Sequence, residues 1–255
     1  MTSTFYHIPY SPWSLRALRA LEHHEVFPSL RIYTPFVSER EMRAAMNEKH
    51  ARVTVPVWLV DDEVLSDSWT IAKHAEQTSN AAKLFPAEFE KEVLEANRLS
   101  DQILDPARSR SLVRVLKNPL AVKEALPRSL GRIPIVSSVV GKSVLQKFCA
   151  KYGIQSDDYD SYGQKARDGL ESLRTLVKRA RAEDRLTLLP SFSYADITLG
   201  LSLQLLRPPL ETPLKKESRK ASTDDELCEE FADLLQWRDE LHEEFGLLPR
   251  RQKRS

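Results

Sequence analysis

The sequence has few of the residues on which several classes of site and scaffold depend. Only two of the 255 residues are cysteines, Cys149 and Cys228. Two distant cysteines exclude a disulfide scaffold and favour a reducing compartment. All seven glycines lie at or after Gly131, so no glycine-rich dinucleotide loop can follow the first predicted strand. The six histidines show no metal-ligand spacing with the cysteines. We therefore predict no metal site.

Long apolar runs and an excess of charge of one sign are also missing. No apolar run is long enough to span a bilayer, and the first residues lack the basic and apolar segments of a signal peptide. With 38 Lys and Arg against 37 Asp and Glu, the formal charge of +1 creates no global field that would favour nucleic acid. Residues 247–255 are basic and are interpreted as a solvated tail. We predict a cytoplasmic protein that binds neither nucleic acid nor a membrane.

The centre of the prediction is the segment from Val53 to Ile71. Residues 53–58 are rich in β-branched residues and predict a strand, but Pro56 belongs at a strand start or bend, and it is a candidate cis proline. Residues 63–65 predict a second short strand. The cluster at residues 66–68, Ser-Asp-Ser, offers N-caps for a helix that runs to about Gln77. The free N–H groups at the start of that helix suit a ligand carboxylate.

The residues before this segment predict two parallel strands joined by a helix. Residues 4–8 form the first strand and residues 30–33 the second. Between them, Ser11 and Pro12 are the expected cap and first turn of a helix, and leucines spaced by three give it a buried face. Residues 39–47 predict another short helix. The predicted order is βαβα followed by ββα.

The second half of the chain predicts helices only. Residues 79–87 are interpreted as a linker, and helical apolar spacing recurs near residues 88–104, 109–126, 143–152, 159–181, 194–206 and 223–244. Ser193 and Asp196 are spaced as a capping box, and we assign Asp196 to structure alone. Residues 109–150 and 207–222 match no pattern that we can place, and we interpret 207–222 as a mobile loop. We predict two domains, at residues 1–78 and 88–246.

Three motifs in this order resemble the thioredoxin-like domain of the glutathione transferase superfamily. Residues 10–16, Tyr-Ser-Pro-Trp-Ser-Leu-Arg, look like the active-site turn of the serine-type classes and are closest to the tau pattern. The Val55-Pro56 pair resembles the cis proline of the family. Residues 67–71, Asp-Ser-Trp-Thr-Ile, resemble its acidic-Ser motif for the γ-glutamyl end of glutathione. Residues 193–196, Ser-Tyr-Ala-Asp, resemble a box in the helical domain of the family, so the resemblance covers both halves.

This resemblance implies both a fold and an activity. The expected fold is an α/β thioredoxin-like N-terminal domain (βαβαββα) followed by an all-α C-terminal domain. The expected function is that of a glutathione transferase in detoxification, with glutathione as co-substrate, a small hydrophobic electrophile as second substrate, and a homodimer as the assembly. The alternatives are a non-catalytic ligand-binding member of the fold and a glutathione-dependent isomerase or ether-cleaving enzyme. Because the active-site turn has no cysteine, a mixed disulfide on the protein is disfavoured.

Ser11 is the candidate catalytic residue. A thiol with a pKa near 8.5 needs a shift of about 1.5 units, or about 2 kcal/mol, to be half ionised at pH 7. A charge-assisted hydrogen bond contributes about 1.5–3 kcal/mol and a helix N-terminus about 0.3–1 kcal/mol, so a serine at that position suffices. Ser11 would donate to the sulfur of glutathione. Ser14, one turn along, is the nearest alternative, and Tyr6 or Tyr10 would act as in the tyrosine-type classes.

The remaining site residues are carried over from the resemblance. Val55 and Pro56 are expected to bind the cysteinyl part of glutathione, and Asp67 and Ser68 its γ-glutamyl part. Many family members place Lys or Gln before the Val-Pro pair, where this chain has Thr54. A contact to the glycine carboxylate is therefore expected from Arg52, with Lys49 and His50 as alternatives. Trp13 and Tyr33 are the candidates for the hydrophobic substrate pocket.

Overall fold

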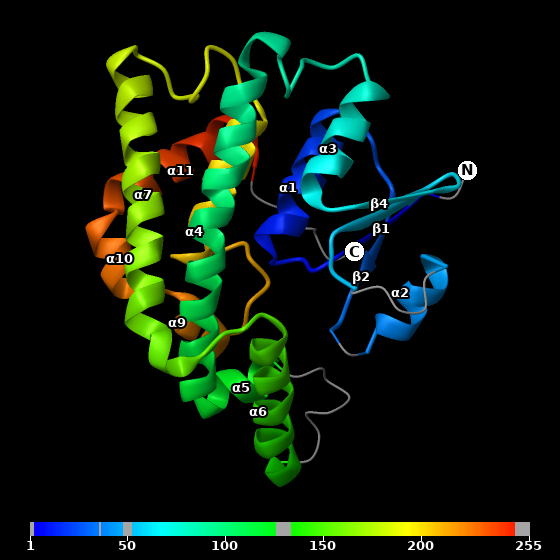
Figure 1. The fold of residues 1–255 in the computed structure, drawn as a ribbon, viewed down its shortest axis with the longest axis vertical. Helices are drawn as coiled ribbons and strands as arrows, with labels where there is room; N and C mark the ends of the chain where they lie inside the picture. Colours follow the sequence, from blue (N-terminus) through cyan, green and yellow to red (C-terminus); the bar gives the residue numbers. More distant parts are fainter. Residues whose placement is uncertain (1–2, 36, 48–52, 126–133, 248–255) are drawn as a thin grey trace.

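A computed structural model describes residues 3–35, 37–47, 53–125 and 134–247 of the chain (Figure 1). Its first part has the predicted order βαβαββα, which is thereby confirmed. The elements are β1 (Thr4–His7), α1 (Pro12–His23), β2 (Ser29–Ile32), α2 (Glu39–Ala45), β3 (Val57–Val60), β4 (Glu63–Ser66) and α3 (Ser68–Gln77).

These strands form one mixed sheet in the order β2-β1-β3-β4. Strand β1 pairs in parallel with β2, because α1 is a crossover between them, and β3 pairs antiparallel with both β1 and β4. The predicted strand from Val53 was wrong at its start, since β3 begins only at Val57. The Val55-Pro56 peptide bond is cis, as predicted, and Pro56 has no N–H for a sheet ladder.

Helices cover both faces of the sheet. On one face, Phe5 and Trp58 pack against Leu21 of α1 and Ile71 of α3. On the other, Met42 of α2 lies against the sheet residues. Phe5 is 0% exposed, and complete burial of such a side chain stabilises the fold by about 1.5–3 kcal/mol. The two cores hold the strand ends, where the site is expected, in fixed positions.

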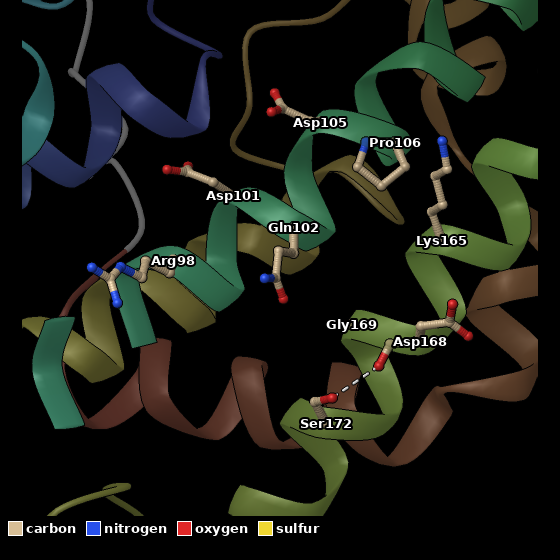
Figure 2. Close-up of a pocket in the computed structure, with 9 residues that line it drawn as sticks. All are labelled: Arg98, Asp101, Gln102, Asp105, Pro106, Lys165, Asp168, Gly169 and Ser172. Carbon is tan, nitrogen blue, oxygen red and sulfur yellow. Dashed lines mark hydrogen bonds between the residues drawn. The ribbon is translucent and has the colours of Figure 1, made fainter. Parts of the chain in front are cut away.

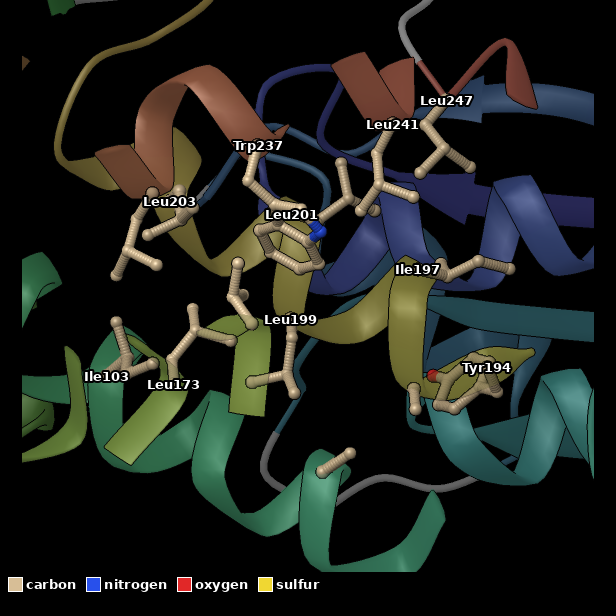
Figure 3. Close-up of a cluster of buried hydrophobic side chains, with 14 of the residues drawn as sticks. Ile103, Leu173, Tyr194, Ile197, Leu199, Leu201, Leu203, Trp237, Leu241 and Leu247 are labelled. Atoms are coloured by element: carbon tan, nitrogen blue, oxygen red, sulfur yellow. The ribbon is translucent and has the colours of Figure 1, made fainter. Parts of the chain in front are cut away.

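The second part of the chain is helical, as predicted. Helix α8 lies at its centre, with every residue buried, and packs against α1 of the first part, against the long helix α4 and against α11 (Figures 1 and 3). The elements are η1 (Ala87–Phe89), α4 (Glu90–Lys117), α5 (Pro119–Ala125), α6 (Pro134–Lys151), η2 (Ser156–Asp158), α7 (Tyr159–Ala182), α8 (Tyr194–Ser202), η3 (Leu203–Leu205), α9 (Lys216–Ser222), α10 (Asp225–Glu230) and α11 (Ala232–Phe245).

Helix α4 differs from the prediction of two helices with a break near residue 105. The helix runs through Pro106, which is buried, because α4 packs against α7 and α8 along its length. Such packing offsets the hydrogen bond that a proline removes. The break lies instead at Asn118, whose Oδ1 accepts from the N–H groups of Leu120 and Ala121 at the start of α5. Pro119, in the first turn, suits that start.

Residues 207–222 also differ from the prediction of a mobile loop. Residues 216–222 form α9, and Arg219 in that helix donates to four main-chain carbonyls of the preceding segment. The acceptors are the carbonyls of Pro208, Pro209, Leu210 and Thr212, at 2.9, 2.7, 3.1 and 2.6 Å. Pro208 and Pro209 have no N–H to donate, so this segment is short of main-chain donors. The Arg219 guanidinium supplies donors to its carbonyls instead. Among the helices of the described residues, none is both long and apolar enough to cross a membrane.

Candidate active site

The strand register brings the three predicted motifs to one edge of the sheet. Tyr6 of β1 lies opposite Val57 of β3, and Val57 lies opposite Ser66 of β4. The turn that follows β1, the cis proline that precedes β3 and the start of α3 that follows β4 therefore share an edge. These segments contain Ser11, Pro56 and Ser68 in turn. The predicted glutathione site is consistent with this arrangement, although its residues are widely separated in the sequence.

The two serines of the active-site turn have different surroundings. Ser11 is the N-cap residue of α1, and its partly exposed side chain makes no capping hydrogen bond. Ser14 is 0% exposed, and its Oγ accepts from the N–H of Ile8 at 3.2 Å. The turn is also tied to the helical part, because Gln204 donates to the carbonyl of Tyr10 at 3.2 Å. Ser14 thus has a structural partner within the turn, whereas the Ser11 hydroxyl does not serve as a cap.

The start of α3 has the features of an anion-binding helix terminus. Asp67 is its N-cap, with Oδ1 accepting from the Thr70 N–H at 2.8 Å and Oδ2 from the Thr70 hydroxyl at 2.9 Å. The exposed carboxylate has further lone pairs for an ammonium group. The φ of Asp67 is +66°, in a region that non-glycine residues adopt at a cost in free energy. Ser68, next to it, is 5% exposed.

The residues around the cis proline are only partly covered by the structure. Val55 is half-buried and Pro56 is buried at the start of β3. Arg52, with the alternatives Lys49 and His50, lies outside the described residues. The carbonyl of Val53, just before the cis bond, accepts from the ammonium group of Lys151 at 3.0 Å.

Trp13 connects the active-site turn to helix α4. Its indole N–H donates to Asp101 Oδ1 at 3.1 Å, and the same oxygen accepts from Arg16 Nη1 at 2.9 Å. Arg16 is 1% exposed and also donates to Ser100, whose hydroxyl donates to the carbonyl of Thr198 at 2.7 Å. One network of polar side chains therefore joins helices α1, α4 and α8 next to the active-site turn.

Helix α6 and the residue after it reach the same region, which the sequence did not predict. The guanidinium of Arg108 lies 5.0 Å from the Trp13 ring centre and 4.3 Å from that of Tyr152. Such stacking is a favourable cation–π arrangement. Nothing in the local sequence around Arg108 or Tyr152 indicated this contact, because it depends on how α4 and α6 pack.

Tyr33 belongs to the core on the α2 side of the sheet. It is 5% exposed and packs with Tyr6, Met42 and Val57. Burial, followed by the nearby charge of Glu39, raises the pKa of Tyr33 to about 12. Its hydroxyl is therefore neutral at physiological pH. The predicted role of Tyr33 in a substrate pocket stays a prediction.

A cleft of about 620 Å³ lies between α4 and α7 (Figure 2). Charged and polar side chains, among them Asp105, Lys165 and Asp168, make up most of its lining. Figure 2 shows the Asp101 carboxylate directed away from α7, toward α1, where it contacts Trp13 and Arg16. Neither Trp13 nor Tyr33, the residues predicted to line the substrate pocket, lines this cleft.

Comparisons with known proteins agree with this architecture. Residues 5–83 match the family described as "Glutathione S-transferase, N-terminal domain". A search of curated proteins found no match. Among solved structures, glutathione transferase GSTFuA3 from Phanerochaete chrysosporium is 16% identical, with a TM-score of 0.65 and 97% of each chain covered.

Two further solved structures carry glutathione. The glutathione S-transferase CsGST63524 of Ceriporiopsis subvermispora, in complex with glutathione, is 16% identical, with a TM-score of 0.63 and coverage of 98% of this chain and 99% of the other. A glutathione S-transferase of Methylobacillus flagellatus with bound glutathione is 18% identical, with a TM-score of 0.60 and coverage of 97% and 100%. The chain therefore has the fold of the glutathione transferases, and its N-terminal part matches the N-terminal domain of that family.

Proposed function

We propose that this protein is a serine-type glutathione transferase, in which the Ser11 hydroxyl donates to the glutathione sulfur and stabilises its thiolate for attack on a hydrophobic electrophile. The observation that carries the proposal is the difference between the two serines of the turn. Ser14 accepts from the main chain of Ile8, whereas Ser11 caps nothing and stands at the N-terminus of α1. A hydroxyl at this position can donate a hydrogen bond to a thiolate, and the positive end of the α1 helix dipole also stabilises the thiolate charge.

The rest of the glutathione molecule would follow the edge of the sheet. We place its cysteinyl backbone at Val55, beside the cis Pro56, and its γ-glutamyl amine at the carboxylate of Asp67. The γ-glutamyl carboxylate would bind Ser68 and the free N–H groups of α3, since a helix N-terminus favours an anion. Arg52 is proposed for the glycine carboxylate. Bound glutathione in two structures of this fold supports the choice of ligand.

The electrophile would lie beside Trp13, on the helical side of the turn. The contacts of the Arg108 guanidinium with the rings of Trp13 and Tyr152 support a pocket wall at this position. We further propose that the protein is cytoplasmic and acts as a homodimer in detoxification. A size measurement in solution tests the dimer independently of the chemistry.

The decisive experiment compares the bound thiol in the parent, in Ser11→Ala and in Ser14→Ala. Thiolate absorbance against pH gives the pKa of the bound thiol, and turnover with an aryl halide gives the rate. Loss of about 1.5–3 kcal/mol in Ser11→Ala should raise that pKa by about one to two units and slow turnover at pH 7 by about ten- to a hundredfold. The two rates should converge at high pH, because the thiol then ionises without help.

The Ser14→Ala control should act on folding instead. It removes the acceptor of the partly buried Ile8 N–H, which costs up to about 1–3 kcal/mol of stability, and the bound thiol should keep its pKa. A pKa that rises in Ser14→Ala but not in Ser11→Ala would move the catalytic role to Ser14. An unshifted thiol pKa in the parent would favour a non-catalytic ligand-binding member of the fold.

A further inference from the structure

Gln204 connects the core of the helical part to the turn before helix α1. It lies in η3 and is 2% exposed, and its Nε2 donates to the carbonyl of Tyr10 at 3.2 Å. Leu203, the residue before it, belongs to the buried cluster shown in Figure 3. The guanidinium of Arg238 in α11 donates to the carbonyls of Leu203 and Arg207, at 3.3 and 2.7 Å. Gln204 therefore extends from an element that the core holds in place.

The peptide unit between Tyr10 and Ser11 is hydrogen-bonded through both of its polar atoms. Its oxygen accepts from Gln204, and its N–H donates to the carbonyl of Ile8 at 3.0 Å. The next peptide unit is also held, because the carbonyl of Ser11 accepts from the Leu15 N–H at 2.9 Å. With both neighbouring peptide units fixed, the position of the Ser11 hydroxyl depends on its χ1 angle, which is restricted to staggered values.

The side chains of the turn do not replace the bond from Gln204. Tyr10 is 46% exposed, so its side chain gives the turn little packing against the core. Without the amide of Gln204, water would bind the Tyr10 carbonyl, and the peptide unit before Ser11 would be free to rotate. Hydrogen bonds weaken steeply when distance and angle depart from their best values. Such a rotation would therefore weaken the bond from the Ser11 hydroxyl to the glutathione sulfur.

We infer that Gln204 is a positioning residue, whose amide holds the peptide unit between Tyr10 and Ser11 so that the Ser11 hydroxyl is directed at the glutathione sulfur. This inference rests on the proposed function. A group that stabilises an anion by a charge-assisted hydrogen bond must be held close to its productive geometry by the residues around it. The helical part of the chain then contributes to thiolate formation through the turn, without contact between Gln204 and glutathione.

The test measures the pKa of the bound glutathione thiol in the parent, in Gln204→Met and in Gln204→Asn. Methionine fills a similar space but has no N–H. Asparagine is the milder change, since it keeps the amide but is too short to reach the Tyr10 carbonyl. Weakening of the bond to the thiolate should raise the thiol pKa by about 0.5–1 unit and slow turnover with an aryl halide at pH 7 by about three- to tenfold. Both changes should be smaller than in Ser11→Ala, which removes the donor itself.

Two comparisons separate positioning from a general loss of stability. Ser202→Ala removes a buried hydrogen bond of 2.7 Å to the carbonyl of Leu199, close to Gln204 in the chain but within α8. This control should lower the melting temperature, as Gln204→Met does, and should leave the thiol pKa unchanged. In the Ser11→Ala background, Gln204→Met should raise the thiol pKa no further, because the hydroxyl that it positions is gone.

The outcomes distinguish this inference from the proposed function. An unchanged thiol pKa in the Gln204 variants, an equal rise in Ser202→Ala, or a rise from Gln204→Met that persists without the Ser11 hydroxyl would overturn the inference alone. A folded parent that binds no glutathione at millimolar concentration, or whose bound thiol has an unshifted pKa, would overturn the proposed function itself.

Discussion

Asp196 offers the sharpest test of how the helical part of the chain is held together. Its carboxylate is 0% exposed and accepts three hydrogen bonds. Oδ1 accepts from the Leu188 N–H at 2.7 Å, and Oδ2 accepts from the N–H and the hydroxyl of Ser193 at 2.9 and 3.0 Å. The capping box predicted from the sequence is therefore confirmed, and it has an additional partner in Leu188.

Replacement of Asp196 by alanine should destabilise the protein without changing its chemistry. Two main-chain N–H groups lose their acceptors, and each unpaired buried group costs about 1–3 kcal/mol. Because water can reach part of the site, we expect the free energy of unfolding to fall by about 2–4 kcal/mol. The assay is urea unfolding followed by circular dichroism. Asp62→Ala, at an exposed turn, is the control and should change stability by less than about 0.5 kcal/mol.

The same residue predicts a pH dependence of stability. Burial raises the pKa of Asp196 to about 6, from 3.8 in an unfolded chain, so between these values the native state holds a proton that the unfolded state has lost. This contribution is therefore fully present below pH 3.8 and is lost as the pH rises through 6. About two units correspond to about 3 kcal/mol. The stability difference between the parent and Asp196→Asn should be largest near pH 4 and smaller by up to about 3 kcal/mol at pH 7.

Two results would refute this reasoning. If Asp196→Ala unfolded at the same urea concentration as the parent but lost turnover, the carboxylate would belong to the chemistry and not to the cap. If the difference between the parent and Asp196→Asn grew with rising pH, the native state would favour the charged carboxylate, and the three donors would outweigh burial.

Two further predictions concern packing and the segment before α9. Gly169→Ala should lower the free energy of unfolding by about 1–3 kcal/mol, because a Cβ there would lie 2.8 Å from Ile103 Cγ1 and 3.5 Å from the Ile103 nitrogen. Gly200→Ala should instead raise it by about 0.5–1 kcal/mol, because the nearest atom to a Cβ there, in Leu241, would be 3.7 Å away. Urea unfolding of both variants checks this, and equal stabilities would contradict the packing argument. Arg219→Ala removes four hydrogen bonds to the segment before α9, so it should lower the free energy of unfolding by about 1–3 kcal/mol and speed proteolysis within residues 207–215. Lys220→Ala, at an exposed position of the same helix, is the control. Unchanged cleavage would show that Arg219 does not hold this segment.

The order of elements in the first part of the chain, and the starts of several helices, could be predicted from local signals. Pro12 suits a first helical turn, Asp67 a cap, and Ser193 with Asp196 a capping box, because each acts on backbone groups within a few residues. The cis bond at Pro56 belongs with these, since only an X-Pro bond adopts cis at modest cost. Local chemistry therefore determined where several elements begin.

The tertiary structure decided whatever depends on residues far apart in the chain. The local sequence around Pro106 predicts a helix break, but packing against α7 and α8 keeps α4 continuous. Lys151 donates to the Val53 carbonyl from 98 residues away, and Asp101 accepts from Trp13 across 88. Such contacts arise because buried polar groups and apolar faces find their partners when the whole chain packs, and a local pattern specifies only that a partner is needed.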